Sequence, residues 1–179
     1  MSPVKSEMHK GVLSKMPADL PQQKRRAAIL LVFAPQTRPL YDTTRMAYSV
    51  QVYQVDYFSQ HEWGETPSQM LHPLLVGALQ GTHAFSAVLM PPYAGRYHYA
   101  LRTEILELRQ DFTSEPAVLH LSLRFQLSDD AANRIIATKE ILLREPMQQR
   151  TPYAGVVAAN DAAAKALKEM ASFVLEKTS

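Results

Sequence analysis

Apolar and polar residues alternate most regularly between Ala117 and Leu127. Successive side chains of a strand point to opposite faces, so this pattern predicts one strand with an apolar side and a polar side. Burying each Leu or Phe stabilises a fold by about 1.5–3 kcal/mol, so a one-residue slip in register would be costly. The apolar positions are Leu119, Leu121, Leu123, Phe125 and Leu127, and the polar ones are His120, Ser122, Arg124 and Gln126.

Similar alternation precedes this strand in Tyr97–Ile105 and follows it in Ile135–Leu143. Residues 129–133 include two Asp and one Asn, which are typical of a tight turn. The pattern predicts an antiparallel meander of three strands with one covered face. After Ile105 the apolar places shift to Leu106 and Leu108, which favours a β-bulge.

The apolar run Ala27–Phe33 predicts a central strand covered on both faces, and Phe85–Leu89 predicts a short strand. Thr66–Gln69 has the spacing of a capping box and precedes an apolar stripe of helical period that ends near Gly81. A second helix is predicted over Gly155–Glu176, with alanines on its inner face. Together these elements predict an α+β fold: a two-layer sandwich of a mainly antiparallel sheet with two helices packed on one face.

Residues 1–23 lack a clean period and contain Pro3, Pro17 and Pro21. They are expected to form a flexible lead-in or tether. Residues 24–179 are expected to form a single domain, which suits a chain of 179 residues.

Composition removes several classes of function. The chain has no cysteine, which excludes disulfides, thiolate metal sites and a Cys nucleophile. The formal net charge of +2 does not favour nucleic acid, and no nucleic-acid partner is expected. No signal peptide is visible, and the longest apolar run, Ala27–Ala34, is too short to span a bilayer.

Candidate chemistry is sparse. No nucleophile elbow, P-loop, dinucleotide fingerprint or zinc-protease motif occurs, and the six histidines have no ligand spacing. We therefore expect no catalytic residues, cofactor or metal. The alternative is a small hydrolase that uses Ser68 or Ser86 together with His72 or His83.

Aromatic residues gather between Pro35 and Trp63, where the helix signal is weak. Half-exposed aromatics on irregular backbone suit a binding or subunit surface, because they bury a large area at modest entropic cost. The competing interpretation is that they close the edge of the core. The candidate surface residues are Tyr41, Arg45, Tyr48 and Tyr57.

Several stretches resemble the ABC-type transport auxiliary lipoprotein family, in that family's order, from about Ala27 to Phe173. The matching segments are Tyr41-Asp42-Thr43-Thr44-Arg45-Met46-Ala47-Tyr48, Gln54-Val55-Asp56-Tyr57-Phe58, Trp63, Met70 to Leu75, Leu106 to Phe112, and Tyr153 to Asn160 ahead of a helix. The resemblance implies a non-enzymatic, lipoprotein-type component of an ABC/MCE lipid transport system of the Gram-negative envelope, acting as a binding and assembly module. A general envelope scaffold without a lipid role is the other non-enzymatic alternative.

The resemblance also implies the partners and the location. The expected partners are an MCE-domain protein and an ABC permease/ATPase complex, with lipid and a second copy of the chain as further candidates. The expected location is the periplasm, in the form of an outer-membrane-anchored lipoprotein. Because family members carry a lipidated Cys and this chain has none, membrane contact is expected only through an N-terminal lipid anchor absent from this chain.

Overall fold

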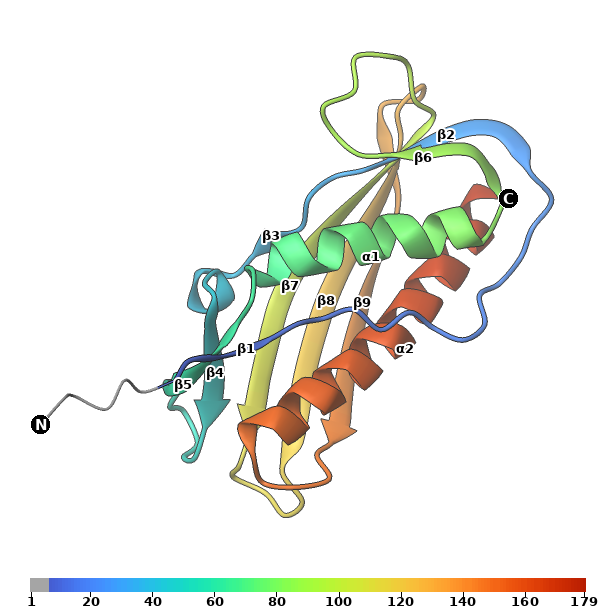
Figure 1. Ribbon diagram of the computed structural model, residues 1–179. Coiled ribbons are helices and arrows are strands. Elements are labelled where there is room, and N and C mark those ends of the chain that lie inside the picture. The colour runs from blue at the N-terminus through green and yellow to red at the C-terminus, as the bar shows by residue number, and fades with distance from the viewer. Residues whose placement is uncertain (1–6) are drawn as a thin grey trace, which may run out of the picture.

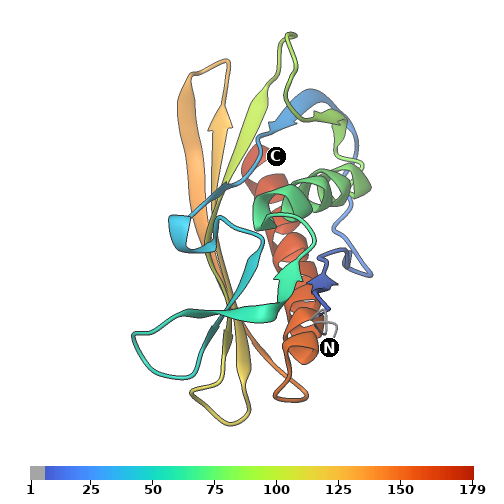
Figure 2. The same ribbon diagram turned by 60° about the vertical axis from the view of Figure 1, so that its left-hand side comes forward.

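A computed structural model describes residues 7–179 as one large curled sheet with two α-helices (Figure 1). In chain order the elements are β1 (His9–Gly11), β2 (Arg26–Val32), β3 (Gln36–Thr37), the 3-10 helix η1 (Pro39–Tyr41), β4 (Arg45–Ser49), β5 (Asp56–Trp63), α1 (Pro67–Gly81), β6 (Phe85–Leu89), β7 (Tyr99–Asp111), β8 (Val118–Asp129), β9 (Arg134–Pro146) and α2 (Pro152–Thr178). Both helices cover the same face of the sheet, and the other face is open (Figure 2).

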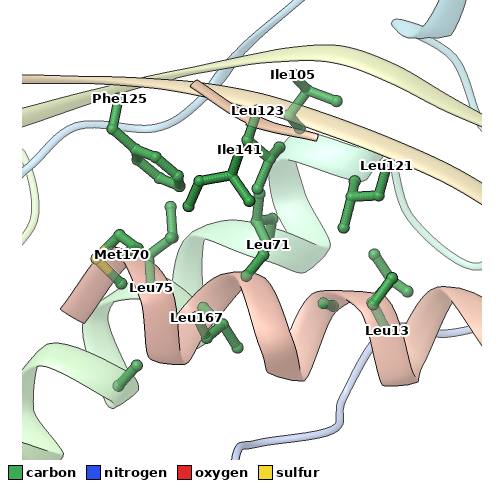
Figure 3. Packing of buried hydrophobic residues seen from close by; sticks show 14 of the residues in the cluster. Leu13, Leu71, Leu75, Ile105, Leu121, Leu123, Phe125, Ile141, Leu167 and Met170 are labelled. Atoms are coloured by element: carbon green, nitrogen blue, oxygen red, sulfur yellow. The ribbon is translucent and has the colours of Figure 1, made fainter. Parts of the chain in front are cut away.

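The predicted meander is confirmed. β8 pairs antiparallel with β7 and β9, and Leu123 lies opposite both Ile105 and Ile141. Figure 3 shows these side chains pointing together toward Leu167 and Met170 of α2. The five alternating Leu and Phe residues of β8 are at most 3% exposed. The predicted bulge is also present, because the register of β7 against β8 shifts between Ile105 and Glu107.

The prediction of a mainly antiparallel sheet is wrong, although the α+β class is confirmed. β2, β3 and β4 follow one another along the same edge of β7, and all three run parallel to it. β6 is also parallel to β2, and β1 is parallel to β5. Alternation within one strand identifies its buried face but not the direction of its neighbour, so the sequence pattern could not reveal this mixture.

The helix ends follow from local sequence. Thr66 and Gln69 form the predicted capping box: the Thr66 side chain accepts from the Gln69 amide, and the Gln69 side chain accepts from the Thr66 amide at 3.0 Å. α1 begins at Pro67 and continues through Pro73. Among residues 7–179, neither helix is both long and apolar enough to cross a membrane.

Small residues bring α2 close to the sheet. Between Ala154 and Ala166, eight buried positions of this helix are alanine or glycine. At Gly155 an added Cβ would lie 1.9 Å from the Gln110 side chain of β7. That Gln110 amide is buried and donates to the Pro152 carbonyl at 3.0 Å, which fixes the start of α2 against β7.

The tether predicted for residues 1–23 is wrong from His9 onward, while residues 1–6 lie outside the described part of the chain. β1 pairs with the end of β5, with His9 opposite His61. Leu13 is only 7% exposed and belongs to the core. This docking depends on two apolar side chains that share no period, Leu13 and Leu20, and on hydrogen bonds to residues distant in sequence. Neither produces a periodic pattern in the sequence.

Asn160 of α2 holds the same segment. Its side-chain oxygen accepts from the Ser14 amide at 2.9 Å and the Lys15 amide at 3.2 Å, and its nitrogen donates to the Val12 carbonyl at 2.9 Å. Three backbone groups of an irregular segment are thus satisfied by one side chain. The N-terminal segment is therefore part of the folded body.

The meander should dominate stability. We expect Leu121→Ala or Leu123→Ala to lower the free energy of unfolding by about 2–5 kcal/mol, as for other buried leucines. Gln126→Ala, on the open face of the same strand, should change it by less than about 0.5 kcal/mol. Chemical denaturation measures both, and equal losses would show that β8 is buried on both faces.

The docked N-terminal segment should also contribute to the stability of the fold. Deleting residues 2–23 removes Leu13 and β1, so the melting temperature should fall by more than about 5 °C. Lys15→Ala removes only the exposed ion pair with Asp161 and should leave the melting temperature unchanged. A thermal melt of the deletion that matches the full chain would contradict the docking.

Candidate functional site

The candidate surface residues lie on and beside the hairpin of β4 and β5. On the side of the open sheet face, the Arg45 guanidinium carbon lies 4.4 Å from the centre of the Tyr57 ring. The Tyr57 hydroxyl donates to the Leu40 carbonyl of η1 at 2.6 Å. Arg45 is exposed and Tyr57 is half-buried, so a planar cation stacked on an aromatic ring is presented to solvent.

Tyr48 lies on the other side of the same hairpin. It pairs with Asp56, and its ring stacks on Phe58 with centroids 4.2 Å apart and planes 15° apart. Phe112 meets both rings edge-on, and Arg150 lies over Phe112 at 5.5 Å. The structure therefore brings Arg45 and Tyr57 together but places Tyr48 in a second aromatic group on the opposite face.

Tyr41, the last residue of η1, does not reach the surface and is only 6% exposed. Burial raises the pKa of its phenol, and the nearby Glu107 carboxylate raises that pKa further. Its ring is buried beside Glu107 and Arg109 of β7, outside the main apolar cluster. Its burial therefore leaves little of Tyr41 available for a partner to contact.

Charged side chains form a network on the open face next to Tyr41. Arg109 contacts Glu107 at 2.9 Å and Asp111 at 3.8 Å, and His120 lies 3.5 Å from Glu107 and 3.0 Å from Asp111. Burial alone would raise the pKa of Asp111, but hydrogen bonds from Thr113 and His120 and the charge of Arg109 lower it overall. Asp111 is therefore held as a carboxylate, and the network fixes the end of β7 where β4 pairs with it.

Sequence reasoning missed the tip of the hairpin. Val50 and Val52 are 60% and 61% exposed, and Tyr53 is fully exposed with a positive φ of 67°. The turn between β4 and β5 projects away from the sheet (Figure 2). Three apolar residues in a turn were a usable signal, but the turn could not be located because Val50–Tyr53 also suited a strand.

The residues of the alternative hydrolase do not form a catalytic pair. The Ser68 hydroxyl donates to the Pro35 carbonyl at 2.5 Å, and the Ser86 hydroxyl donates to the Ala28 carbonyl at 3.0 Å. His72 instead contacts the Val32 carbonyl at 2.8 Å, and His83 is exposed at the turn after α1. Because each serine is engaged by backbone, no histidine orients either of them as a nucleophile.

A metal centre finds no support in the part of the chain that the structure describes. No group of three or more His, Cys, Asp or Glu side chains there is arranged to hold an ion. His9 and His61 are stacked with ring centroids 5.0 Å apart, and burial together with His9 lowers the pKa of His61. This pair sits where β1 joins β5, with no third ligand beside it.

Comparison with known structures shows the same fold elsewhere. Protein XCC0632 from Xanthomonas campestris is 17% identical, with a TM-score of 0.82 over 96% of each chain. An uncharacterized protein is 14% identical, with a TM-score of 0.68 over 93% of this chain and 99% of that chain. The protein CT253 from Chlamydia trachomatis is 9% identical, with a TM-score of 0.54 over 83% of this chain and 96% of that chain.

A search of curated proteins finds no match to the sequence. A family model does match, over residues 12–171, which is most of the folded chain and includes the docked N-terminal segment from Val12 onward. The matched range contains η1, the β4–β5 hairpin, the meander and most of α2. The chain therefore belongs to the ABC-type transport auxiliary lipoprotein component family.

Proposed function

We propose that this chain is a non-enzymatic binding and assembly module of an ABC-type transport system in the Gram-negative cell envelope. The family match over residues 12–171 is the observation that carries the proposal. An auxiliary component works by contact with other components. Its function therefore depends on a surface rather than on a catalytic centre.

The β4–β5 hairpin is the surface best suited to this role. One side of the hairpin presents Arg45 stacked on Tyr57, and the other presents Tyr48 stacked on Phe58. Val52 and Tyr53 are exposed at its tip. Aromatic and Arg side chains dominate the energetics of protein interfaces. Exposed apolar side chains at a projecting turn also gain most by insertion into a partner, because water no longer has to solvate them.

The proposed partner is the MCE-domain protein of a lipid transport system that also contains an ABC permease and ATPase, or a second copy of this chain. The proposed location is the periplasm, in the form of an outer-membrane-anchored lipoprotein. These finer assignments follow from the family resemblance. Tyr41 is buried, so it is expected to act on association only through the stability of the fold.

Changes in the hairpin should weaken assembly without unfolding the protein. We expect Arg45→Ala, and a double variant with Val52→Ser and Tyr53→Ser, each to weaken association by about tenfold, because each removes interface contacts worth about 1.4 kcal/mol. The measurements are light scattering for self-association and pull-down with the purified MCE-domain protein. Circular dichroism and thermal melts should match the unchanged protein.

Leu142→Ser is the matched control, because Leu142 is also exposed, at 68%, but lies on β9. It should leave association unchanged. If Leu142→Ser weakens association while the hairpin variants do not, the interface is on the open sheet face instead. If the hairpin variants instead melt at a lower temperature but associate normally after correction for the folded fraction, the hairpin has a structural role only.

Tyr41→Ala should behave differently from the hairpin variants. Truncating this buried ring should cost about 3 kcal/mol of unfolding free energy. Its effect on association should disappear after correction for the folded fraction in the same thermal melt. Loss of association in a fully folded Tyr41→Ala protein would place Tyr41 in the interface directly.

A further inference from the structure

A cavity of about 540 Å³ lies where the strand beside β7 is interrupted. β2 pairs with β7 as far as Val32, opposite Leu101, and β3 resumes at Gln36, opposite Glu104. Pro35 lies between them, and it has no N–H to give to the sheet. The Phe33 amide still donates to the Leu101 carbonyl of β7 at 3.1 Å, but the chain leaves this edge at residues 34–35, which creates a hollow beside Arg102.

Arg102 is the principal charged group of this cavity. Its guanidinium carbon lies 4.3 Å from the centre of the Phe33 ring, which orients the planar cation. Its closest polar side-chain contact is a long one, 3.5 Å to the Ser128 hydroxyl. Within residues 7–179, Arg102 forms no ion pair with a carboxylate. An exposed cation stacked on a ring keeps its N–H edge free to bind an anion.

The second arginine of the cavity is already neutralised. Arg124 contacts Glu104 at 3.2 Å and Glu140 at 2.8 Å, and the hydrogen bond to Glu140 is the main reason that the pKa of Arg124 is raised. Glu104 also lines the cavity, so it opposes an incoming anion. Arg102 thus attracts an anionic ligand, and the Glu104 carboxylate weakens that attraction.

Apolar side chains form the rest of the wall. Phe33, Met90 and Pro91 line the cavity, and Met90 is 47% exposed at its mouth. Gln126 lines it from the neighbouring strand β8, opposite Arg102, and offers an amide donor. A cation and an amide beside an apolar wall suit a molecule with a small anionic head and an apolar chain.

We propose that this cavity binds an amphiphile whose carboxylate or phosphate head pairs with Arg102 while its apolar chain lies along Phe33, Met90 and Pro91. The cavity is on β7 and the loop after β6, away from the β4–β5 hairpin. Ligand binding therefore does not require the partner surface proposed above. Conversely, failure of either proposal leaves the other standing.

Isothermal titration calorimetry with decanoate and with decyl phosphate, both below their micelle concentrations, tests the site. Decanol is the neutral probe of the same chain length. Decanoate or decyl phosphate should bind saturably, and decanol at least about tenfold more weakly, because it cannot pair with the guanidinium. Decanoate binding would identify a carboxylate head, and binding of decyl phosphate alone would identify a phosphate head.

Two variants in the cavity are expected to change the ligand affinity in opposite directions. Arg102→Gln should weaken binding by at least about tenfold, whereas Glu104→Gln should strengthen it by removing a repelling carboxylate, with Arg124 still paired to Glu140. Arg144→Gln, on β9 of the same sheet, is the matched control and should bind normally. The proposal is overturned if neither anion binds, if decanol binds equally well, or if Arg144→Gln loses as much affinity as Arg102→Gln.

Discussion

The packing of α2 against the apolar face of β7, β8 and β9 holds the core of this protein together. Leu123 and Phe125 of β8 meet Leu167 and Met170 of α2 across this contact (Figure 3). Alanines in the first half of α2 allow the two layers to approach closely there, while larger side chains fill the interior along its second half. The same helix also holds the N-terminal segment and fixes the C-terminal end of the chain against β2. Asn160 holds the N-terminal segment, and Arg26 is hydrogen-bonded by its guanidinium to the Thr178 hydroxyl at 2.7 Å.

β7 is the strand beside which the proposed partner surface and the proposed ligand cavity both form. One edge carries β8, and the other carries β2, β3 and β4 in succession. The interruption after β2 opens the cavity beside Arg102, and the pairing of β4 near Asp111 aims the hairpin away from the sheet. Two different surfaces thus arise from breaks in the strands that run along a single edge.

Networks of charged side chains, rather than packed apolar ones, lie on the open face of the sheet. Arg124 is held between Glu104 and Glu140, and His120 contacts both Glu107 and Asp111. Such networks keep a broad sheet face solvated and leave Arg102 as a cation without an ion-pair partner among the described residues. The lack of an ion-pair partner for Arg102 among the described residues therefore distinguishes the proposed ligand cavity from the rest of the open face.

Local pattern determined much of the fold. Alternation in β8, the Thr66–Gln69 capping box and the shift after Ile105 each act through neighbours in sequence, so the meander, α1 and the bulge were predicted correctly. The family was also recognisable from ordered segments, whereas the partner surface predicted from Arg45, Tyr48 and Tyr57 stays a prediction. Tertiary structure alone decided the parallel pairing along β7, the docking of residues 9–23 on β5 and α2, and the separation of Tyr48 from Arg45 and Tyr57. These features depend on contacts between distant residues, and a strand's own alternation carries no record of which neighbour it meets or in which direction.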